Sequence, residues 1–135
     1  MRWICAVVAL QMATLMAAPA AACPLPSTAL QRGAVQAMWK VEGAPIAAAI
    51  KQSKLFSVEV QVCPATALLT RVDATMPEHL HGLNYRPSVQ RIGDAKDGRW
   101  RADGLMFHMP GRWELRFDVQ ADGRTEKLTD TVLLP

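Results

Sequence analysis

The 135-residue sequence contains neither a glycine-rich phosphate-binding loop nor a serine in a nucleophile elbow. No pair of carboxylates stands isolated as an acid and base would in a cleft, and the thiols that remain after export are candidates for a disulfide. These absences remove the usual signatures of nucleotide-dependent enzymes, serine hydrolases and acid–base catalysts. We therefore expect a protein that is not an enzyme.

Clusters of like charge are also missing. Fifteen lysines and arginines are interspersed with twelve aspartates and glutamates, whereas nucleic-acid-binding proteins concentrate basic residues on one face. The sequence thus predicts no nucleic-acid partner. Long amphipathic helices, repeats and linkers are absent as well, which favours a single domain built mostly of strands.

The first 22 residues have the pattern of a secretory signal peptide. Arg2 gives a positive start, residues 4–16 are almost wholly apolar, and three alanines precede Cys23. We expect cleavage there and a periplasmic or secreted protein without a transmembrane span in its mature part. The alternatives are an uncleaved anchor and a lipoprotein acylated at Cys23, which is disfavoured because Ala20 stands where a lipobox has leucine.

Cleavage would leave 113 of the 135 residues, divided into a tail at 23–33 and a domain at 34–135. Cys5 leaves with the signal, so that Cys23 and Cys63 remain. Two cysteines in an exported chain predict a disulfide, here one that ties the tail to the domain. The alternatives are two unpaired cysteines or acylation of Cys23.

Apolar and polar residues alternate along much of the mature chain, with the period of half-buried strands. An Asp-Gly hairpin turn is expected at 121–124, a bulge at 103–104 and one helical turn at 47–50. Trp39, Trp100 and Trp113 are expected in the core or on a sheet face. The fold prediction is an all-β, immunoglobulin-like antiparallel sandwich of about seven strands, at residues 33–42, 55–62, 68–74, 88–92, 100–107, 113–119 and 125–134.

Residues 76–85 and 104–113 together contain all three histidines of the chain. If consecutive strands run alternately up and down, the loops that follow the third and fifth strands lie at the same end of the sandwich. By the same reasoning Cys23 and Cys63 share the opposite end.

These two segments, with the preceding Val-Asp-Ala-Thr-Met-Pro at 72–77, resemble the YtkA-like/FixH-like family of exported immunoglobulin-like β-sandwich domains. The resemblance covers residues 35–134. It implies an envelope location, a metal-handling context in which copper is prominent, and a metalloprotein or assembly partner in the envelope. FixH-type members also carry a membrane helix used in oxidase assembly, and this sequence has none beyond its signal.

His79 and His81 are two residues apart, so their imidazoles would point the same way in an extended segment. Met76 precedes them, and His108 with Met109 is expected from the neighbouring turn. Imidazoles and thioethers form a soft, neutral ligand set that suits copper, especially Cu(I). We therefore predict a copper site formed by these five residues, with His79 and His81 as the principal ligands.

Other interpretations of the same residues remain open. Zinc would use the histidines with Glu78 or Asp73 as a carboxylate ligand. Without a metal, the histidines would be solvated or bonded to backbone, and the methionines would fill the core. The competing function is a metal-free interaction module that docks a partner protein through the same loops.

Four further residues are predicted to structure the loops rather than to bind. Asp73 is expected to pair with one of three arginines, at positions 71, 86 and 112. Asn84 tolerates tight turns, and Tyr85 offers an apolar ring with a polar tip as an anchor. Arg112 lies in the second histidine segment.

Overall fold

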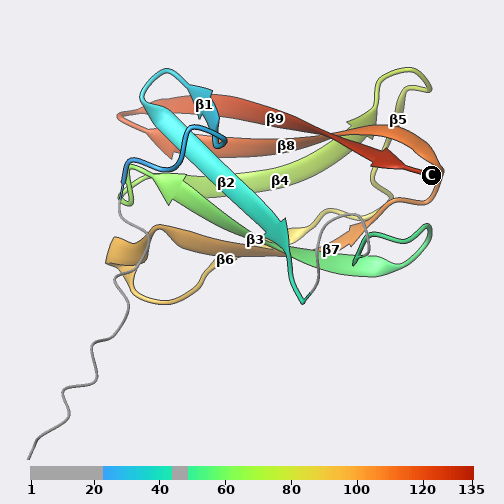
Figure 1. Cartoon of the computed structure of the whole chain (residues 1–135), viewed down its shortest axis with the longest axis horizontal. Helices are drawn as coiled ribbons and strands as arrows, with labels where there is room; N and C mark the ends of the chain where they lie inside the picture. The colour runs from blue at the N-terminus through green and yellow to red at the C-terminus, as the bar shows by residue number, and fades with distance from the viewer. Residues whose placement is uncertain (1–22, 44–48) are drawn as a thin grey trace, which may run out of the picture.

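The computed structural model describes residues 23–43 and 49–135. The predicted signal peptide lies outside these residues, as do residues 47 and 48 of the predicted helical turn at 47–50. The described part is built almost wholly of strands (Figure 1). They are β1 (Leu30–Arg32), β2 (Val35–Val41), β3 (Leu55–Cys63), β4 (Leu68–Met76), β5 (His81–Gly82), β6 (Ser88–Arg91), β7 (Arg99–Met106), β8 (Gly111–Ala121) and β9 (Arg124–Leu134), with a 3-10 turn, η1 (Ala95–Asp97), before β7.

The strands form two antiparallel sheets. One has the order β1-β2-β3-β7-β6 and the other β5-β4-β8-β9, and they face each other as the two layers of a sandwich (Figure 1). The predicted all-β sandwich is therefore confirmed. The short edge strands β1 and β5 were not predicted, and β1 lies within the segment expected to be a tail. In the described ranges, no helix is long and apolar enough to cross a membrane.

The strands show the predicted alternation of buried and exposed residues, and their buried side chains form the core. Along β3, Phe56, Val58, Val60 and Val62 are all buried, whereas the residues between them are partly exposed. Trp113, from β8, is the largest fully buried residue. The remaining fully buried large side chains come from both sheets: Phe107, Phe117, Met76, Leu105, Leu115, Val72 and Val119.

Two local predictions are also confirmed. Between the pairs Phe56↔Leu105 and Val58↔Ala102, β7 contains one residue more than β3, which is a bulge at the predicted position 103–104. At the β8–β9 hairpin, Asp122 and Gly123 have φ values of 50° and 73°. Positive φ at both central residues is the geometry of a type I′ turn, which Asp-Gly favours.

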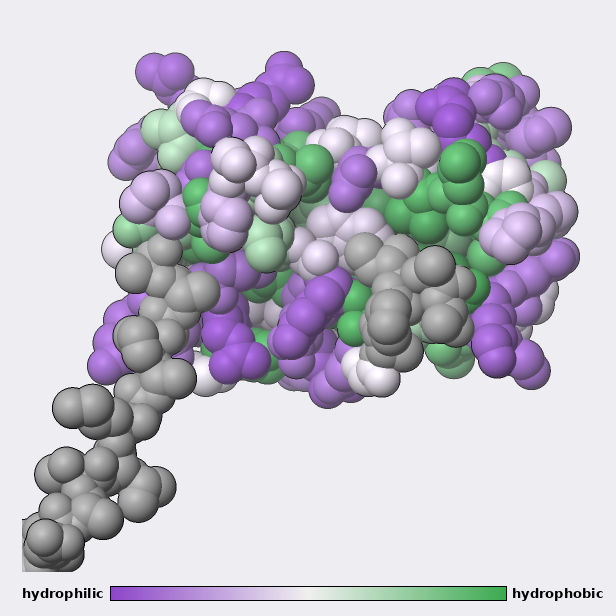
Figure 2. Space-filling model, in the orientation of Figure 1, coloured by the Kyte–Doolittle hydropathy of each residue, from purple (hydrophilic) through white to green (hydrophobic). Residues whose placement is uncertain are grey.

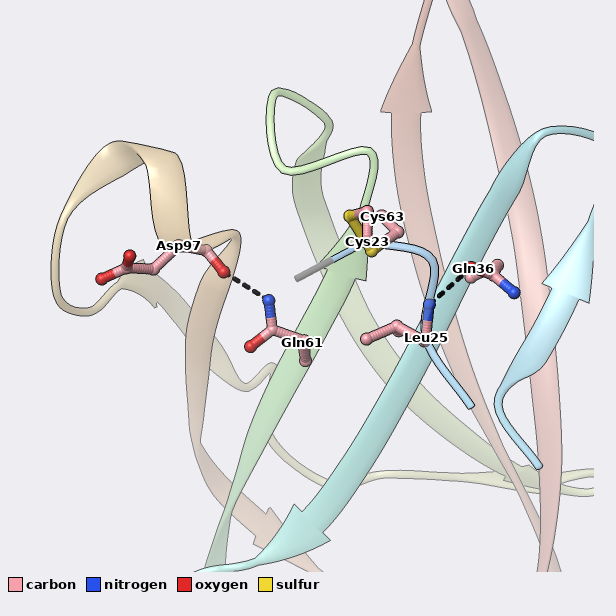
Figure 3. Close-up of a disulfide and its surroundings, with 6 residues drawn as sticks. All are labelled: Cys23, Leu25, Gln36, Gln61, Cys63 and Asp97. Atoms are coloured by element: carbon pink, nitrogen blue, oxygen red, sulfur yellow. Dashed lines mark hydrogen bonds between the residues drawn. A yellow bond between two sulfur atoms is a disulfide. The ribbon is translucent and has the colours of Figure 1, made fainter. Parts of the chain in front are cut away.

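The disulfide joins Cys23 to Cys63, as predicted, at the end of β3. Beyond it, residues 23–29 run across the outer face of β2 and β3, and Figure 3 shows Leu25 between Gln36 and Gln61. The Leu25 amide donates a hydrogen bond of 2.9 Å to Oε1 of Gln36, and the Leu25 side chain is buried. The segment is therefore fixed to the sheet by a covalent bond, a hydrogen bond and an apolar contact. We call residues 23–29 the strap.

The bulge carries an aspartate whose ionisation should be linked to folding. Ser57 Oγ donates a 2.5 Å hydrogen bond to Oδ1 of Asp103, and Arg101 Nε donates to the same oxygen at 2.7 Å. These bonds lower the pKa of Asp103 below its ordinary value, the Ser57 bond having the largest effect. The stabilisation is therefore present above about pH 3.9, the ordinary aspartate pKa, and is lost as the pH falls through the lower folded value.

We expect Ser57→Ala to raise the pKa of Asp103 toward its ordinary value, and to make acid unfolding begin at a higher pH. A carboxyl-carbon NMR titration of both proteins measures the pKa directly. Ser57→Thr, which retains a hydroxyl, should keep the pKa low. An unchanged Asp103 pKa in Ser57→Ala would show that Arg101 alone sets it.

Candidate functional site

The first histidine segment is a tight turn closed by a short strand. Residues 77–80 form the turn after β4, and the His79 amide donates a 3.2 Å hydrogen bond to the Met76 carbonyl. Leu80 has φ +52°, and the chain then returns as β5, with His81 paired opposite Met76. His79 and His81 therefore do not lie in one extended segment, and the geometry expected to align their imidazoles is not present.

The second histidine segment is the turn between β7 and β8, which three hydrogen bonds hold in place. Ser53 N donates to the Phe107 carbonyl at 2.8 Å, and Gln52 Nε2 donates to the His108 carbonyl at 3.3 Å. Trp113 Nε1 donates to the Met109 carbonyl at 3.0 Å. The backbone that carries His108 is thus fixed to the turn before β3 and to Trp113 of β8.

The two turns meet at one end of the sandwich, as the strand count predicted. The ring centroids of His81 and His108 are 5.9 Å apart, with the ring planes at 86°. Two imidazoles that share one ion at nitrogen–metal distances of about 2.0 Å place their centroids about 5–6 Å apart. The separation of the pair is therefore within the range that a shared metal ion requires.

His108 has an unpaired nitrogen. Its Nδ1 is buried and has no hydrogen-bond partner among the described residues, and its ring lies edge-to-face on Trp113 with centroids 5.4 Å apart. A buried polar atom without a partner costs about 1–3 kcal/mol, so such atoms are uncommon unless a ligand or water meets them. This nitrogen is a chemically sensible ligand for a soft metal.

The methionines lie on the inner side of the histidine pair. Met76 is buried, and as the cross-strand partner of His81 it projects to the same face of the β4–β5 ladder. Its Cε comes within 2.8 Å of where a β-carbon on Gly111 would stand, so the side chain reaches the β7–β8 turn. Met109 is partly buried against the core. Both residues pack as core methionines do, and both have sulfur at this end.

The acidic residues do not complete a zinc site. Within residues 23–43 and 49–135, no three side chains of His, Cys, Asp or Glu come together as metal ligands. Glu78 instead accepts a 3.0 Å hydrogen bond from Arg112 Nε, and Asp73 is bound to Arg71. The donors left near the histidine pair are two imidazoles and two thioethers, a set that fits copper better than zinc.

The residues predicted to structure the loops differ in the contacts that they make. Arg112 links the first histidine turn to β8, since it binds both Glu78 and, at 3.1 Å, Glu114. The hydrogen bond to Glu78 is the main reason that the pKa of Arg112 is raised. Asp73 pairs with Arg71, one of its three candidates, and more distantly with Arg116 at 3.9 Å.

Asn84 and Tyr85 are both exposed, and Tyr85 has 67% of its surface accessible. The predicted role of Tyr85 as an anchor is therefore not supported, because its ring faces solvent instead of the core. Pro87, two residues further on, is buried where the chain passes to the other sheet.

Several residues that position the site were not identified from the sequence. Trp113 was expected in the core or on a sheet face, yet it also supports both His108 and Met109. Gln52 and Ser53 are 56 and 54 positions away in sequence from the residues that they bind, so no local pattern could reveal them. Gly111 could have been recognised from the sequence, because a glycine at a tight turn marks a place where another group approaches the backbone closely. It has φ +123°, and the group beside it is the Met76 side chain.

No protein-family model, no curated protein and no solved structure matches this chain. The resemblance to the YtkA-like/FixH-like family therefore remains a prediction, and the functional hypothesis depends on the site itself.

Proposed function

We propose that this chain is an exported copper-binding protein, which holds Cu(I) between His81 and His108 at one end of a β-sandwich. The observation that supports the proposal is the 5.9 Å approach of these two imidazoles, one from β5 and the other from the β7–β8 turn. The unpaired buried Nδ1 of His108 adds to it. Met76, opposite His81 in the β4–β5 ladder, supplies a thioether on the same face.

Cu(I) accepts imidazole nitrogen and thioether sulfur readily and tolerates low coordination numbers, whereas zinc sites usually need four ligands. His79 stands at the exposed tip of the turn, outside the pair. We therefore assign the principal ligand roles to His81 and His108, and expect His79 to contribute less than its place in the sequence suggested. The Cys23–Cys63 disulfide is compatible with an oxidising compartment, as an exported protein needs.

A competition titration tests this function. The oxidised protein is titrated with Cu(I) against a chromophoric Cu(I) chelator, with ascorbate as a reductant too weak to open the disulfide. We expect one ion per chain, and about tenfold or greater loss of affinity in His81→Ala and in His108→Ala, equivalent to about 1.4 kcal/mol or more each. His79→Ala should lose less than about threefold.

His79 serves as the matched control because it is an exposed histidine on the same turn, two residues from His81. Circular dichroism of each variant checks that the fold is retained. Equal losses from all three variants would point to unspecific imidazole binding. Binding no tighter than that of a surface histidine would refute the copper site.

A specific observation favours the second candidate, a metal-free interaction module. Leu80 and Leu133 are 94% and 73% exposed, and Leu55 and Tyr85 are 69% and 67% exposed. The strand partners of Leu55 and Leu133 place these two residues near the His108 turn, since Leu55 pairs with Met106 and Leu133 with Arg112. Figure 2 shows hydrophobic residues gathered toward the end of the molecule where β9 finishes. Exposed apolar side chains grouped in this way suit contact with another protein.

The same Cu(I) titration distinguishes between the two candidate functions. An interaction module does not require the histidines to bind Cu(I) more tightly than free imidazole does. It requires the exposed leucines instead. Failure of the Cu(I) titration would therefore leave this second function as the one to pursue.

A further inference from the structure

The outer face of the five-stranded sheet carries a groove of about 460 Å³, and neither His81 nor His108 lines it. Its floor is formed by β2 and β3, and the strap forms one wall through Leu25 and Pro26. A volume of this size is within the range of about 300–1,000 Å³ found for small-molecule sites. The groove is thus large enough for a ligand with a chain of several carbons.

The strap gives this wall a fixed position. The disulfide to Cys63 holds it at one end, and the bond from Leu25 N to Gln36 holds it over β2 (Figure 3). Leu25 is only 6% exposed although it lies on the outer face of the sheet. The apolar wall is therefore built into the oxidised fold.

The groove is apolar on one side and cationic on the other. Met38 projects from the outer face of β2, where a polar residue is usual, and 40% of it is exposed beside Leu25 and Pro26. On the other side Lys40 Nζ and Arg99 Nη2 share a single carboxylate oxygen of Glu59, at 3.1 and 3.6 Å. The Lys40 and Arg99 side chains are 71% and 44% exposed, so both cations are open to a second anion at the edge of an apolar surface.

We propose that this groove binds a small amphipathic anion, with its hydrocarbon chain against Leu25 and Met38 and its carboxylate between Lys40 and Arg99. The apolar part of the ligand replaces water on a surface that the sheet leaves uncovered, which is favourable in proportion to the area covered. The carboxylate supplies the second negative charge that the two cations lack. The ligand class is thus a medium-chain carboxylate.

Calorimetric titration of the disulfide-bonded protein with decanoate, decanol and decylammonium tests both halves of the proposal. We expect saturable one-to-one binding of decanoate, with decanol about tenfold weaker or more and decylammonium weaker still. Lys40→Gln should reduce the preference for decanoate over decanol. Met38→Asp should abolish binding, because it places a carboxylate on the apolar wall.

Leu68→Asp is the matched control. Leu68 is exposed to 42%, much as Met38 is to 40%, but it begins β4 in the other sheet, so this variant should bind decanoate as the parent does. Cys23→Ser/Cys63→Ser should bind more weakly, because the strap is released. Equal binding of decanoate and decanol, unsaturable binding, or retention of affinity in Met38→Asp would overturn the proposal. None of these results depends on Cu(I).

Discussion

Replacing Trp113 with alanine is expected to lower the free energy of unfolding by about 3–5 kcal/mol, the usual cost of removing a large aromatic side chain from a core. Trp113 is fully buried. Its ring is stacked on Phe107, with centroids 4.6 Å apart and planes 6° apart. The cavity would lie between the two sheets, where the surrounding strands cannot close it. Urea denaturation followed by circular dichroism measures the loss.

The same substitution should weaken the candidate metal site. Trp113 Nε1 binds the carbonyl of Met109, and the indole ring supports the imidazole of His108. Without them the turn between β7 and β8 loses one of its three hydrogen bonds and the surface under His108. We expect Cu(I) affinity to fall together with stability.

Trp113→Phe separates the two effects. A phenyl ring keeps much of the buried volume but cannot donate to Met109, so we expect a smaller loss of about 1–2 kcal/mol. Nuclear magnetic resonance of the His108 ring would then report whether the turn has moved. A Trp113→Ala protein as stable as the parent would contradict the assignment of this residue to the core.

Much of the fold could be predicted because its information is local. Alternation at Phe56, Val58, Val60 and Val62 fixes which face of β3 is buried, since a shift by one residue would expose all four. Asp122-Gly123 specifies the hairpin between β8 and β9, because few other residues adopt positive φ at both positions. The pairing of Cys23 with Cys63 followed from the prediction that Cys5 is removed with a signal peptide, which leaves two cysteines.

The short edge strands were not predictable in this way. β5 contains only His81 and Gly82, too few residues to show a period of two. Its existence depends on Leu80 turning the chain back toward Met76, and leucine is an unusual residue for positive φ. The reversal separates His79 from His81, which the sequence alone placed on one face.

The sequence predicted which kinds of side chain would pair, but not which individual residues would do so. Three arginines could reach Asp73 in principle, and Arg71 binds it because residues two apart on β4 share a face. Arg112 binds Glu78 instead, which adjusts the position of the first histidine turn relative to β8. Such choices depend on strand register, and register between β4 and β8 is a tertiary property.

The second large effect is expected from removing the disulfide. The bond closes a loop between residues 40 positions apart, and the loss of chain entropy in the unfolded state is then worth about 4 kcal/mol. We expect Cys23→Ser/Cys63→Ser to lower the free energy of unfolding by about this amount, and chemical reduction of the parent protein to have the same effect. Both are measurable by urea denaturation with and without reductant.

The location of the bond determines which functions should respond. Cys23 and Cys63 lie at the end of β3 opposite Leu55, whose partner Met106 leads into the His108 turn. Under conditions where the variant is folded, its Cu(I) affinity should equal that of the parent, whereas decanoate binding should fall with release of the strap. A loss of Cu(I) affinity equal to the loss of decanoate affinity would show instead that the bond supports the whole sandwich, because the two sites are at different parts of the fold.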